Sequence, residues 1–239
     1  MAILELRGVD KRFGAVTVAD GVTFDVGEAD ALGIIGPNGA GKSSLFNLIT
    51  GNLPADGGQI RFLGVDVTHV SAMRRCHAGM GLTFQIPQPF QQLTVFENLL
   101  VGAAFGSGRS EAQVSRRCAE ILEETGLVDR ANQPAGSLSL LQRKRLELAR
   151  ALATEPKILL LDEIAGGLTE HECGALVETI RSIHRSGVAI VWIEHVLHAL
   201  NAVVDRLLVL DFGKIIGIGP VEEIMASRAV RDVYLGIEV

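Results

Sequence analysis

Gly36-Pro37-Asn38-Gly39-Ala40-Gly41-Lys42-Ser43 is the stretch of sequence that decides the fold. The apolar run Ala31–Ile35 precedes it, and a segment with apolar residues at helical spacing follows and ends at residues 50–51. Glycines allow successive backbone N–H groups to turn inward around phosphate oxygens. A helix that begins near Lys42 adds its positive end. The pattern predicts a Walker A phosphate loop, in which Lys42 reaches the β- and γ-phosphates and the Ser43 hydroxyl binds Mg²⁺.

A second acidic site follows 120 residues after Lys42, in Ile158-Leu159-Leu160-Leu161-Asp162-Glu163. Four aliphatic residues before two acids indicate a buried strand that ends in carboxylates. Beside a phosphate loop, Asp162 is expected to hold Mg²⁺ through water, and Glu163 to orient or deprotonate an attacking water. The alternative is a strand end whose acids are merely solvated.

The rest of the chain alternates strand and helix patterns, which predicts an α/β fold with a parallel sheet covered on both faces. Strands are predicted at residues 3–6, 22–26, 31–35, 60–62, 158–161, 188–193, 207–210 and 214–218. Helices are predicted at residues 95–101, 110–125, 142–153, 170–186, 221–226 and 229–235. Asp211-Phe212-Gly213 is expected to be a hairpin turn.

Composition limits the function classes. A chain of 239 residues is one large domain, or a core with a subdomain. The net charge of −6 argues against a broad nucleic-acid surface, and no apolar run is long enough to span a bilayer, although the mean hydropathy is +0.31. The first residues lack a secretory signal pattern. The three widely spaced cysteines are expected to be reduced thiols in a cytosolic protein.

Five further features occur in order around these two sites. Phe13 precedes the phosphate loop, and Gln85 follows Phe84. Leu138-Ser139-Leu140-Leu141-Gln142 lies just before the predicted helix 142–153, residues 164–169 follow the second acidic site, and His195 follows the strand 188–193. Over nearly its whole length the chain thereby resembles the ATP-binding subunit of an ATP-binding cassette (ABC) transporter.

The resemblance implies a P-loop NTPase (RecA-like) core with a parallel sheet, an N-terminal antiparallel β subdomain and an inserted helical signature subdomain. Residues 1–239 would form a single ABC ATPase domain. The nucleotide-binding core, with the antiparallel β part, would comprise residues 1–86 and 153–239, and the helical subdomain residues 87–152.

The resemblance also assigns roles to site residues. ATP would bind Phe13 (stacked on adenine), Val18, Asn38, Gly39, Ala40, Gly41, Lys42, Ser43 and Ser44. Mg²⁺ would bind Ser43, Gln85 and Asp162, and the catalytic residues would be Glu163, His195 and Gln85. The signature residues Ser139, Leu140, Leu141 and Gln142 would act in trans, on the nucleotide of a second ATP-binding subunit.

Within the superfamily, five segments resemble the branched-chain or hydrophobic amino acid uptake group, in particular the first of its two ATPase subunit types. They are Thr83-Phe84-Gln85, residues 93–99, residues 145–152, Ile193-Glu194-His195 and Val233-Tyr234-Leu235-Gly236. Partners would then be a second ATP-binding subunit (in a heterodimer or a homodimer), two transmembrane permease subunits and, indirectly, a periplasmic solute-binding protein. No nucleic acid is expected. The chain would act at the cytoplasmic face of a prokaryotic inner membrane, peripherally bound. The group also includes systems for urea, amides and aromatic acids, so the resemblance does not fix the cargo.

The chain departs from the family pattern at the signature. Leu140 and Leu141 replace both signature glycines, and Thr169 stands where an Asp is commonest. A Cβ restricts the approach of a backbone amide to phosphate. We therefore expect two unequal composite sites in a heterodimer.

Alternatives stay open at this point. They are a regulatory cassette that binds ATP with weak hydrolysis, a non-transport ABC ATPase, and a P-loop GTPase or small-molecule kinase. The short basic run Arg143-Lys144-Arg145 is expected on the solvated side of its helix. The proline-containing stretch 86–92 is expected to be extended and exposed, and to line a groove for a membrane subunit.

Overall fold

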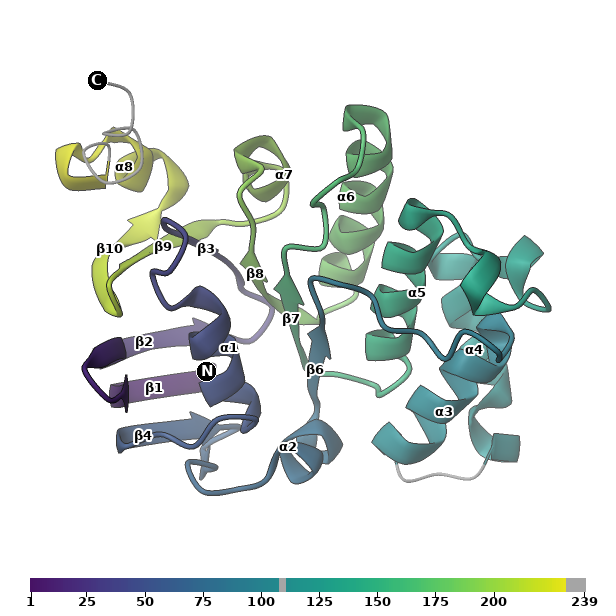
Figure 1. Cartoon of the computed structure of the whole chain (residues 1–239), viewed down its shortest axis with the longest axis horizontal. Coiled ribbons are helices and arrows are strands. Elements are labelled where there is room, and N and C mark those ends of the chain that lie inside the picture. Colours follow the sequence, from purple (N-terminus) through teal and green to yellow (C-terminus); the bar gives the residue numbers. More distant parts are fainter. Residues whose placement is uncertain (108–110, 231–239) are drawn as a thin grey trace.

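The computed structural model describes residues 1–107 and 111–230, and its strands form two sheets (Figure 1). The first sheet has the order β2-β1-β4-β5 and is antiparallel throughout. Its strands are β1 (Ala2–Phe13), β2 (Val16–Gly27), β4 (Gly57–Phe62) and β5 (Val65–Asp66). The expected N-terminal antiparallel part is confirmed, with strands longer than the sequence pattern predicted.

The second sheet has the order β10-β9-β3-β8-β7-β6, in which β9, β3, β8, β7 and β6 run parallel and β10 is antiparallel at the edge. Its strands are β3 (Ala31–Ile35), β6 (Met80–Thr83), β7 (Ile158–Asp162), β8 (Ala189–Ile193), β9 (Arg206–Asp211) and β10 (Lys214–Pro220). Strand β6 was not predicted, because four residues with a glycine among them give too short a pattern. The remaining strands and the turn between β9 and β10 agree with the prediction.

The described part of the chain contains eight α-helices. They are α1 (Lys42–Thr50), α2 (Ala72–Ala78), α3 (Val95–Ser107), α4 (Glu111–Glu124), α5 (Leu140–Leu152), α6 (Glu170–Arg185), α7 (Leu197–Asn201) and α8 (Val221–Ala226). Short 3₁₀ turns occur at Val128–Arg130 and Ala135–Ser137. Helices α2 and α7 were not predicted. Residue 110 of the predicted helix 110–125, most of the predicted helix 229–235 and the motif 233–236 lie outside the described residues.

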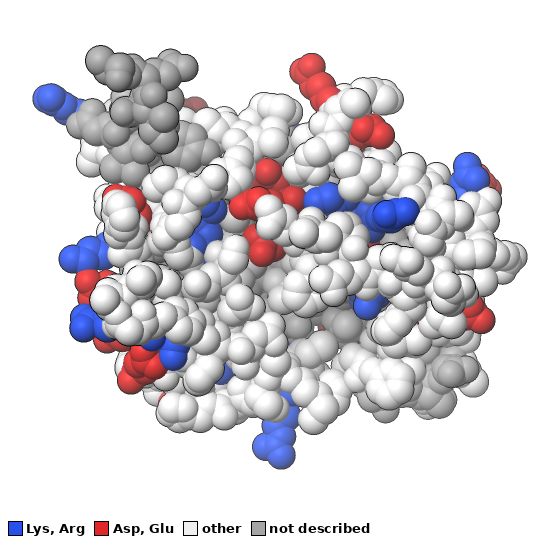
Figure 2. All heavy atoms as spheres, in the orientation of Figure 1, with Lys and Arg blue, Asp and Glu red and all other residues white. Residues whose placement is uncertain are grey.

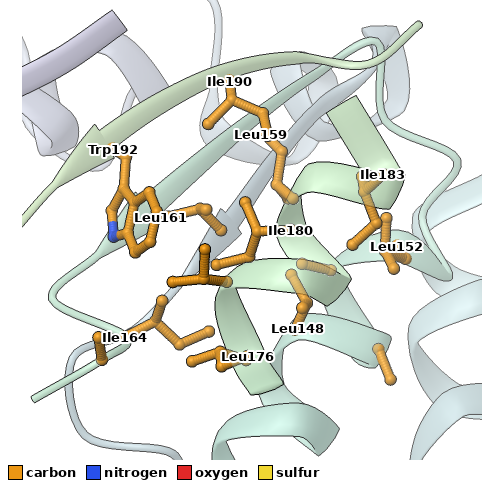
Figure 3. Packing of buried hydrophobic residues seen from close by; sticks show 14 of the residues in the cluster. Leu148, Leu152, Leu159, Leu161, Ile164, Leu176, Ile180, Ile183, Ile190 and Trp192 are labelled. Atoms are coloured by element: carbon orange, nitrogen blue, oxygen red, sulfur yellow. The ribbon is translucent and has the colours of Figure 1, made fainter. Parts of the chain in front are cut away.

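Both faces of the parallel sheet are buried, as alternation along β7 shows. Leu159 and Leu161 belong to a core cluster with α5 and α6, whereas Ile158 and Leu160 belong to a second cluster with α1 and the antiparallel sheet. Figure 3 shows the first cluster, in which side chains of α6 such as Ile180 lie between β7 and α5. The strand is apolar without interruption because each face meets a different core.

Helices α3, α4 and α5 pack against one another at one end of the molecule (Figure 1). They follow one another in the chain, between β6 and β7. The helical insertion expected between the two halves of the core is therefore present. In the described residues, no helix combines the length and apolar character needed to cross a membrane. Cys76, Cys118 and Cys173 are free thiols.

Candidate nucleotide-binding site

The phosphate loop joins β3 to α1 and borders an open pocket of about 290 Å³. Two glycines fix its path, because a Cβ at Gly36 would lie 2.1 Å from the carbonyl oxygen of Leu210, and one at Gly41 would lie 2.3 Å from that of Val18. Gly41 also caps α1 with φ 104°, in the left-handed region that favours glycine. The pocket is lined by Val18, Asn38, Gly39, Gly41, Lys42, Ser43, Ser44 and Glu163.

Two of the residues expected to bind ATP lie outside this lining. Ala40 is buried behind the loop, where its amide donates to the carbonyl oxygen of Pro37 at 3.2 Å. Phe13 ends β1 with half of its surface exposed, and the Lys11 ammonium lies 5.3 Å from the centroid of its ring. An exposed aromatic face is available there for stacking.

Lys42 is the first residue of α1, and its side chain is buried. Its Nζ donates to the carbonyl oxygens of Gly36 at 2.8 Å and Pro37 at 3.1 Å. Burial lowers the pKa of Lys42, while the charges of Glu163 and Asp162 raise it. The ammonium is thus held inside the loop by neutral acceptors, for which a phosphate oxygen is a stronger substitute.

Asp162 ends β7 with an unsatisfied buried oxygen. Its Oδ1 is buried and has no hydrogen-bond partner, and its backbone N–H donates to Thr83 Oγ1 at 3.3 Å. Burial, together with the charge of Glu163, raises the pKa of Asp162 to about 6. A divalent cation would satisfy this oxygen, and Mg²⁺ prefers oxygen ligands and retains several waters. Asp162, with the Ser43 hydroxyl and the Gln85 amide oxygen, is a donor set of that kind.

Glu163 follows β7 in an uncommon backbone conformation, with φ 44°. Its N–H donates to the carbonyl oxygen of Ile193 at 2.9 Å. Gln85 Nε2 donates to Oε2 at 2.5 Å, and His195 Nε2 lies 2.9 Å from Oε1. The three residues expected to be catalytic therefore converge at the carboxyl ends of the adjacent strands β6, β7 and β8.

Charge around these strand ends is mixed in sign. Figure 2 shows acidic side chains gathered near the middle of this face, with basic side chains on either side. Within residues 1–107 and 111–230, no three His, Cys, Asp or Glu side chains form a metal-binding group. A cation at Asp162 would therefore depend on hydroxyl, amide and water ligands as well.

Glu194 is a buried residue of this site that the sequence reading missed. Its Oε2 accepts from the N–H of Ala165 at 3.0 Å, and its Oε1 accepts from the N–H of His195 at 2.9 Å. The carboxylate therefore ties the loop after Glu163 to the loop that carries His195. The sequence contains an indication of this role. Glu194 directly follows a buried strand and precedes a candidate catalytic histidine, and a buried carboxylate at such a place needs a hydrogen-bond donor nearby.

The signature segment begins α5. Ser139 Oγ accepts from the N–H of Gln142 at 3.4 Å, and Gln142 Oε1 accepts from the N–H of Ser139 at 3.0 Å, which is a capping box. Leu140 is half exposed, and Leu141 packs against the core. Thr169 forms the same kind of capping box with Glu172 at the start of α6.

The expected solvated position of Lys144 is wrong. The side chain has only 3% of its surface exposed, and Nζ donates to the carbonyl oxygens of Gln85 at 2.8 Å and Glu163 at 3.2 Å. Lys144 lies at helical spacing from Leu141 and Leu148, which pack into the core, so its face of α5 turns inward.

Comparison with known proteins identifies the family. Residues 19–166, more than half of the chain, match the family model described as ABC transporter. The chain belongs to the ABC transporter family. The family's P-loop ATPase fold accounts for the parallel core sheet, the antiparallel β part and the helical insertion described above.

Two relatives of this ABC transporter protein are similar over nearly their whole length. The high-affinity branched-chain amino acid transport ATP-binding protein BraF of Pseudomonas aeruginosa is 36% identical, with 98% of each chain covered. The probable branched-chain amino acid transport ATP-binding protein LivG of Methanocaldococcus jannaschii is 34% identical, with 99% of this chain and 98% of the relative covered.

Two solved structures resemble the ABC fold of this chain closely. A nucleotide-free ATP-binding cassette from an ABC transporter superposes with a TM-score of 0.90 at 33% identity, covering 98% of this chain and 99% of that one. The ADP conformation of MJ1267, an ATP-binding cassette of an ABC transporter, gives 0.89 at 34% identity, covering 99% of both.

Proposed function

We propose that this chain is the ATP-binding and ATP-hydrolysing subunit of an ABC importer for branched-chain or other hydrophobic amino acids, or for a related small solute. The observation that carries the proposal is the placement of Glu163. Its carboxylate lines the phosphate-loop pocket and is held by Gln85 and His195. The names of the relatives support the amino acid assignment.

ATP would bind at the phosphate loop, with adenine stacked on Phe13 beside Val18. The triphosphate would lie against the amides of residues 38–44, with Lys42 at the β- and γ-phosphates. Bound Mg²⁺ would neutralise developing charge on the phosphates, held by Ser43, Gln85 and Asp162.

The chain's own groups would perform the remaining chemistry. Glu163 orients a water molecule and accepts its proton as the water attacks the γ-phosphorus, while the bond from that phosphorus to the β–γ bridging oxygen breaks and ADP leaves. Gln85 and His195 fix the two carboxylate oxygens, so the base is positioned before the water arrives. Once ATP is bound, His195 would give up its contact with Glu163 and donate to the γ-phosphate instead, while Gln85 continues to hold Oε2 of Glu163.

We propose the assembly that the resemblance implies. Ser139, Leu140, Leu141 and Gln142 would act on ATP bound to a second ATP-binding subunit, in a heterodimer or a homodimer. Residues 87–152 would form a helical subdomain, with residues 1–86 and 153–239 as the core. Two permease subunits would hold the pair at the cytoplasmic face of a prokaryotic inner membrane, supplied by a periplasmic solute-binding protein.

The surface for the permease would lie between α2, β6 and α5. A pocket of about 340 Å³ opens there, and its lining includes residues of these three elements, Phe84, and single residues of α1 and α3. Phe84 lines this pocket, and Phe84, Ile86 and Phe90 of the same segment expose about half of their surface or more. Such a cluster of exposed apolar side chains is typical of a protein-protein contact.

The test is phosphate release by the purified chain with Mg²⁺ and ATP, alone and assembled with the membrane subunits. Glu163→Gln should keep ATP binding and lower turnover by ~10²-fold or more, the size of a lost acid-base role. Glu28→Gln, at an exposed turn, is the matched control. ATP binding without turnover in the assembled complex would favour the regulatory cassette instead.

A further inference from the structure

Three residues spaced one helical turn apart on α5 bind one segment of the chain. Lys144, Glu147 and Arg150 all contact the backbone or a side chain of the segment Phe84–Phe90, which contains Gln85. Residues three apart on a helix share one face, so α5 presents a continuous polar stripe to this segment. The stripe fixes the position of Gln85 relative to α5.

Lys144 makes the two bonds closest to the reaction. Its Nζ donates to the carbonyl oxygens of Gln85 and Glu163, at 2.8 and 3.2 Å. Glu163 has a positive φ of 44°, a backbone conformation that is unfavourable for an L-residue. The Glu163 carbonyl also accepts from the N–H of Gly166 at 3.2 Å. A charge-assisted bond to this carbonyl therefore stabilises the conformation that aims the Glu163 side chain.

Glu147 and Arg150 extend the same contact. The buried Glu147 carboxylate accepts from the N–H of Phe84 at 3.3 Å and pairs with Arg150 at 3.2 Å. Arg150 in turn donates to the carbonyl oxygen of Gln88 at 2.9 Å and lies 5.3 Å from the ring centroid of Phe90. These bonds hold the segment at Phe84, Gln88 and Phe90, so the loss of Lys144 would loosen the backbone at Gln85 without detaching the segment.

The surroundings of Lys144 indicate a role beyond packing. Burial lowers the pKa of the ammonium, and the charges of Glu194, Glu163, Asp162 and Glu147 raise it. Removing an ammonium from water is unfavourable, whereas an apolar side chain would fill the same space without that desolvation. The ammonium therefore carries its charge in a buried place near four carboxylates, in addition to its two bonds to backbone carbonyls.

We propose that Lys144 is a positioning residue, which ties α5 to the backbone of Gln85 and Glu163 and so holds both side chains in their hydrolytic arrangement. The proposal rests on the proposed function, since it concerns the same reaction. Because α5 starts at the Ser139 cap, one turn before Lys144, a displacement of the signature segment would reach Glu163 through this residue.

The test compares Lys144→Met, which removes the ammonium and keeps the stem, with Lys144→Arg, which keeps the charge and its donors. Lys157→Met is the matched control, because Lys157 is exposed and precedes the opposite end of β7. Lys144→Met should lower kcat at least tenfold, on the order expected for a misplaced catalytic group, and change the Kd for ATP by less than about twofold. Lys144→Arg should recover most of the turnover, because its guanidinium can donate to both carbonyls.

Hydrogen exchange of the full chain adds a readout that does not depend on activity. Amides in residues 84–92 should exchange faster in Lys144→Met than in the parent chain or in Lys157→Met, with the thermal midpoint of the core little changed. Unchanged kcat and exchange would overturn the proposal, as would equal losses of kcat and ATP affinity that Lys144→Arg does not recover. If Glu163→Gln also left turnover unchanged, the proposed function itself would fail; a loss with Glu163→Gln alone would refute only the role of Lys144.

Discussion

His195 Nε2 lies 2.9 Å from Glu163 Oε1, although the two residues are 32 positions apart. Strands β7 and β8 bring them together, because Asp162 pairs with Ile193 at the end of the ladder and each chain then turns into its loop. The Glu194 carboxylate also holds the His195 loop, because its Oε1 accepts a hydrogen bond from the N–H of His195. The imidazole therefore contacts the carboxylate of the proposed base directly.

Replacing His195 with alanine removes one of the two contacts on the Glu163 carboxylate. We expect His195→Ala to lower turnover by ~10²-fold, in the range of a lost acid-base or positioning group, with ATP affinity nearly unchanged. His198→Ala is the control, since His198 is exposed on α7. Steady-state kinetics with equilibrium binding of ATP checks this, and equal effects of the two substitutions would contradict it.

Asp162 should make the chain less stable when Mg²⁺ is removed. Its pKa is raised to about 6, so the folded chain disfavours the ionised form and loses stability as pH rises from the ordinary value of 3.8 through 6. Asp162→Asn removes that charge and should raise stability at pH 7.5 in EDTA by roughly 2 kcal/mol, after discounting for solvent.

Thermal unfolding in EDTA measures this difference, which corresponds to roughly 4–8 °C for a chain of this size. In the parent chain, added Mg²⁺ with ATP should raise the midpoint further than ATP alone, and Asp162→Asn should lose that increment. Asp129→Asn, at an exposed carboxylate, should change neither result. A lower midpoint for Asp162→Asn in EDTA would refute the argument.

The two signature leucines should respond differently to glycine. Leu140 is half exposed at the first position of α5, so Leu140→Gly should cost at most about 1 kcal/mol of stability. Leu141 packs against the core, so Leu141→Gly should cost roughly 2–4 kcal/mol. If a Cβ limits access to the partner's phosphate, Leu140→Gly also raises turnover of the assembled complex. Denaturant titration and ATPase assays separate the two effects.

Phe90 should matter for assembly and not for folding. Its ring is half exposed and lies beside the Arg150 guanidinium, which can pair with an introduced carboxylate. Phe90→Asp should therefore keep the fold and ATP binding, and reduce co-purification with the membrane subunits. Phe105→Asp, on the largely exposed Phe105 of α3, is the comparison. Normal assembly of Phe90→Asp would place the docking surface elsewhere.

The sequence predicted the site best where spacing and strand ends determine geometry. The phosphate loop could be read because glycines, strand and helix occur together, and Asp162, Glu163 and His195 because each follows a buried strand in the same parallel sheet. Strand β6 and helix α2 were missed, since Met80–Thr83 is too short to show alternation and Ala72–Ala78 spans only two turns.

Lys144 and Glu194 were missed for a different reason. Each is a charged residue that bonds to backbone atoms distant in sequence, Lys144 to Gln85 and Glu163 and Glu194 to Ala165, and the sequence does not name such partners. For Lys144 the helical spacing to Leu141 and Leu148 was a usable signal, and the adjacent Arg143 and Arg145 obscured it. A lysine at helical spacing from apolar residues therefore predicts a buried ammonium that donates to backbone carbonyls, rather than a solvated side chain.

The capping box at Ser139 and Gln142 has a chemical consequence. Both bonds use the two side chains as acceptors, through Oγ of Ser139 and Oε1 of Gln142. Neither bond uses the hydroxyl hydrogen of Ser139 or the amide NH₂ of Gln142. Each of the two side chains can donate and accept, and because the capping box uses them as acceptors, their donor hydrogens remain available at the start of the helix. These donors, with the positive end of the helix, favour an anion, which can bind them without breaking the capping box.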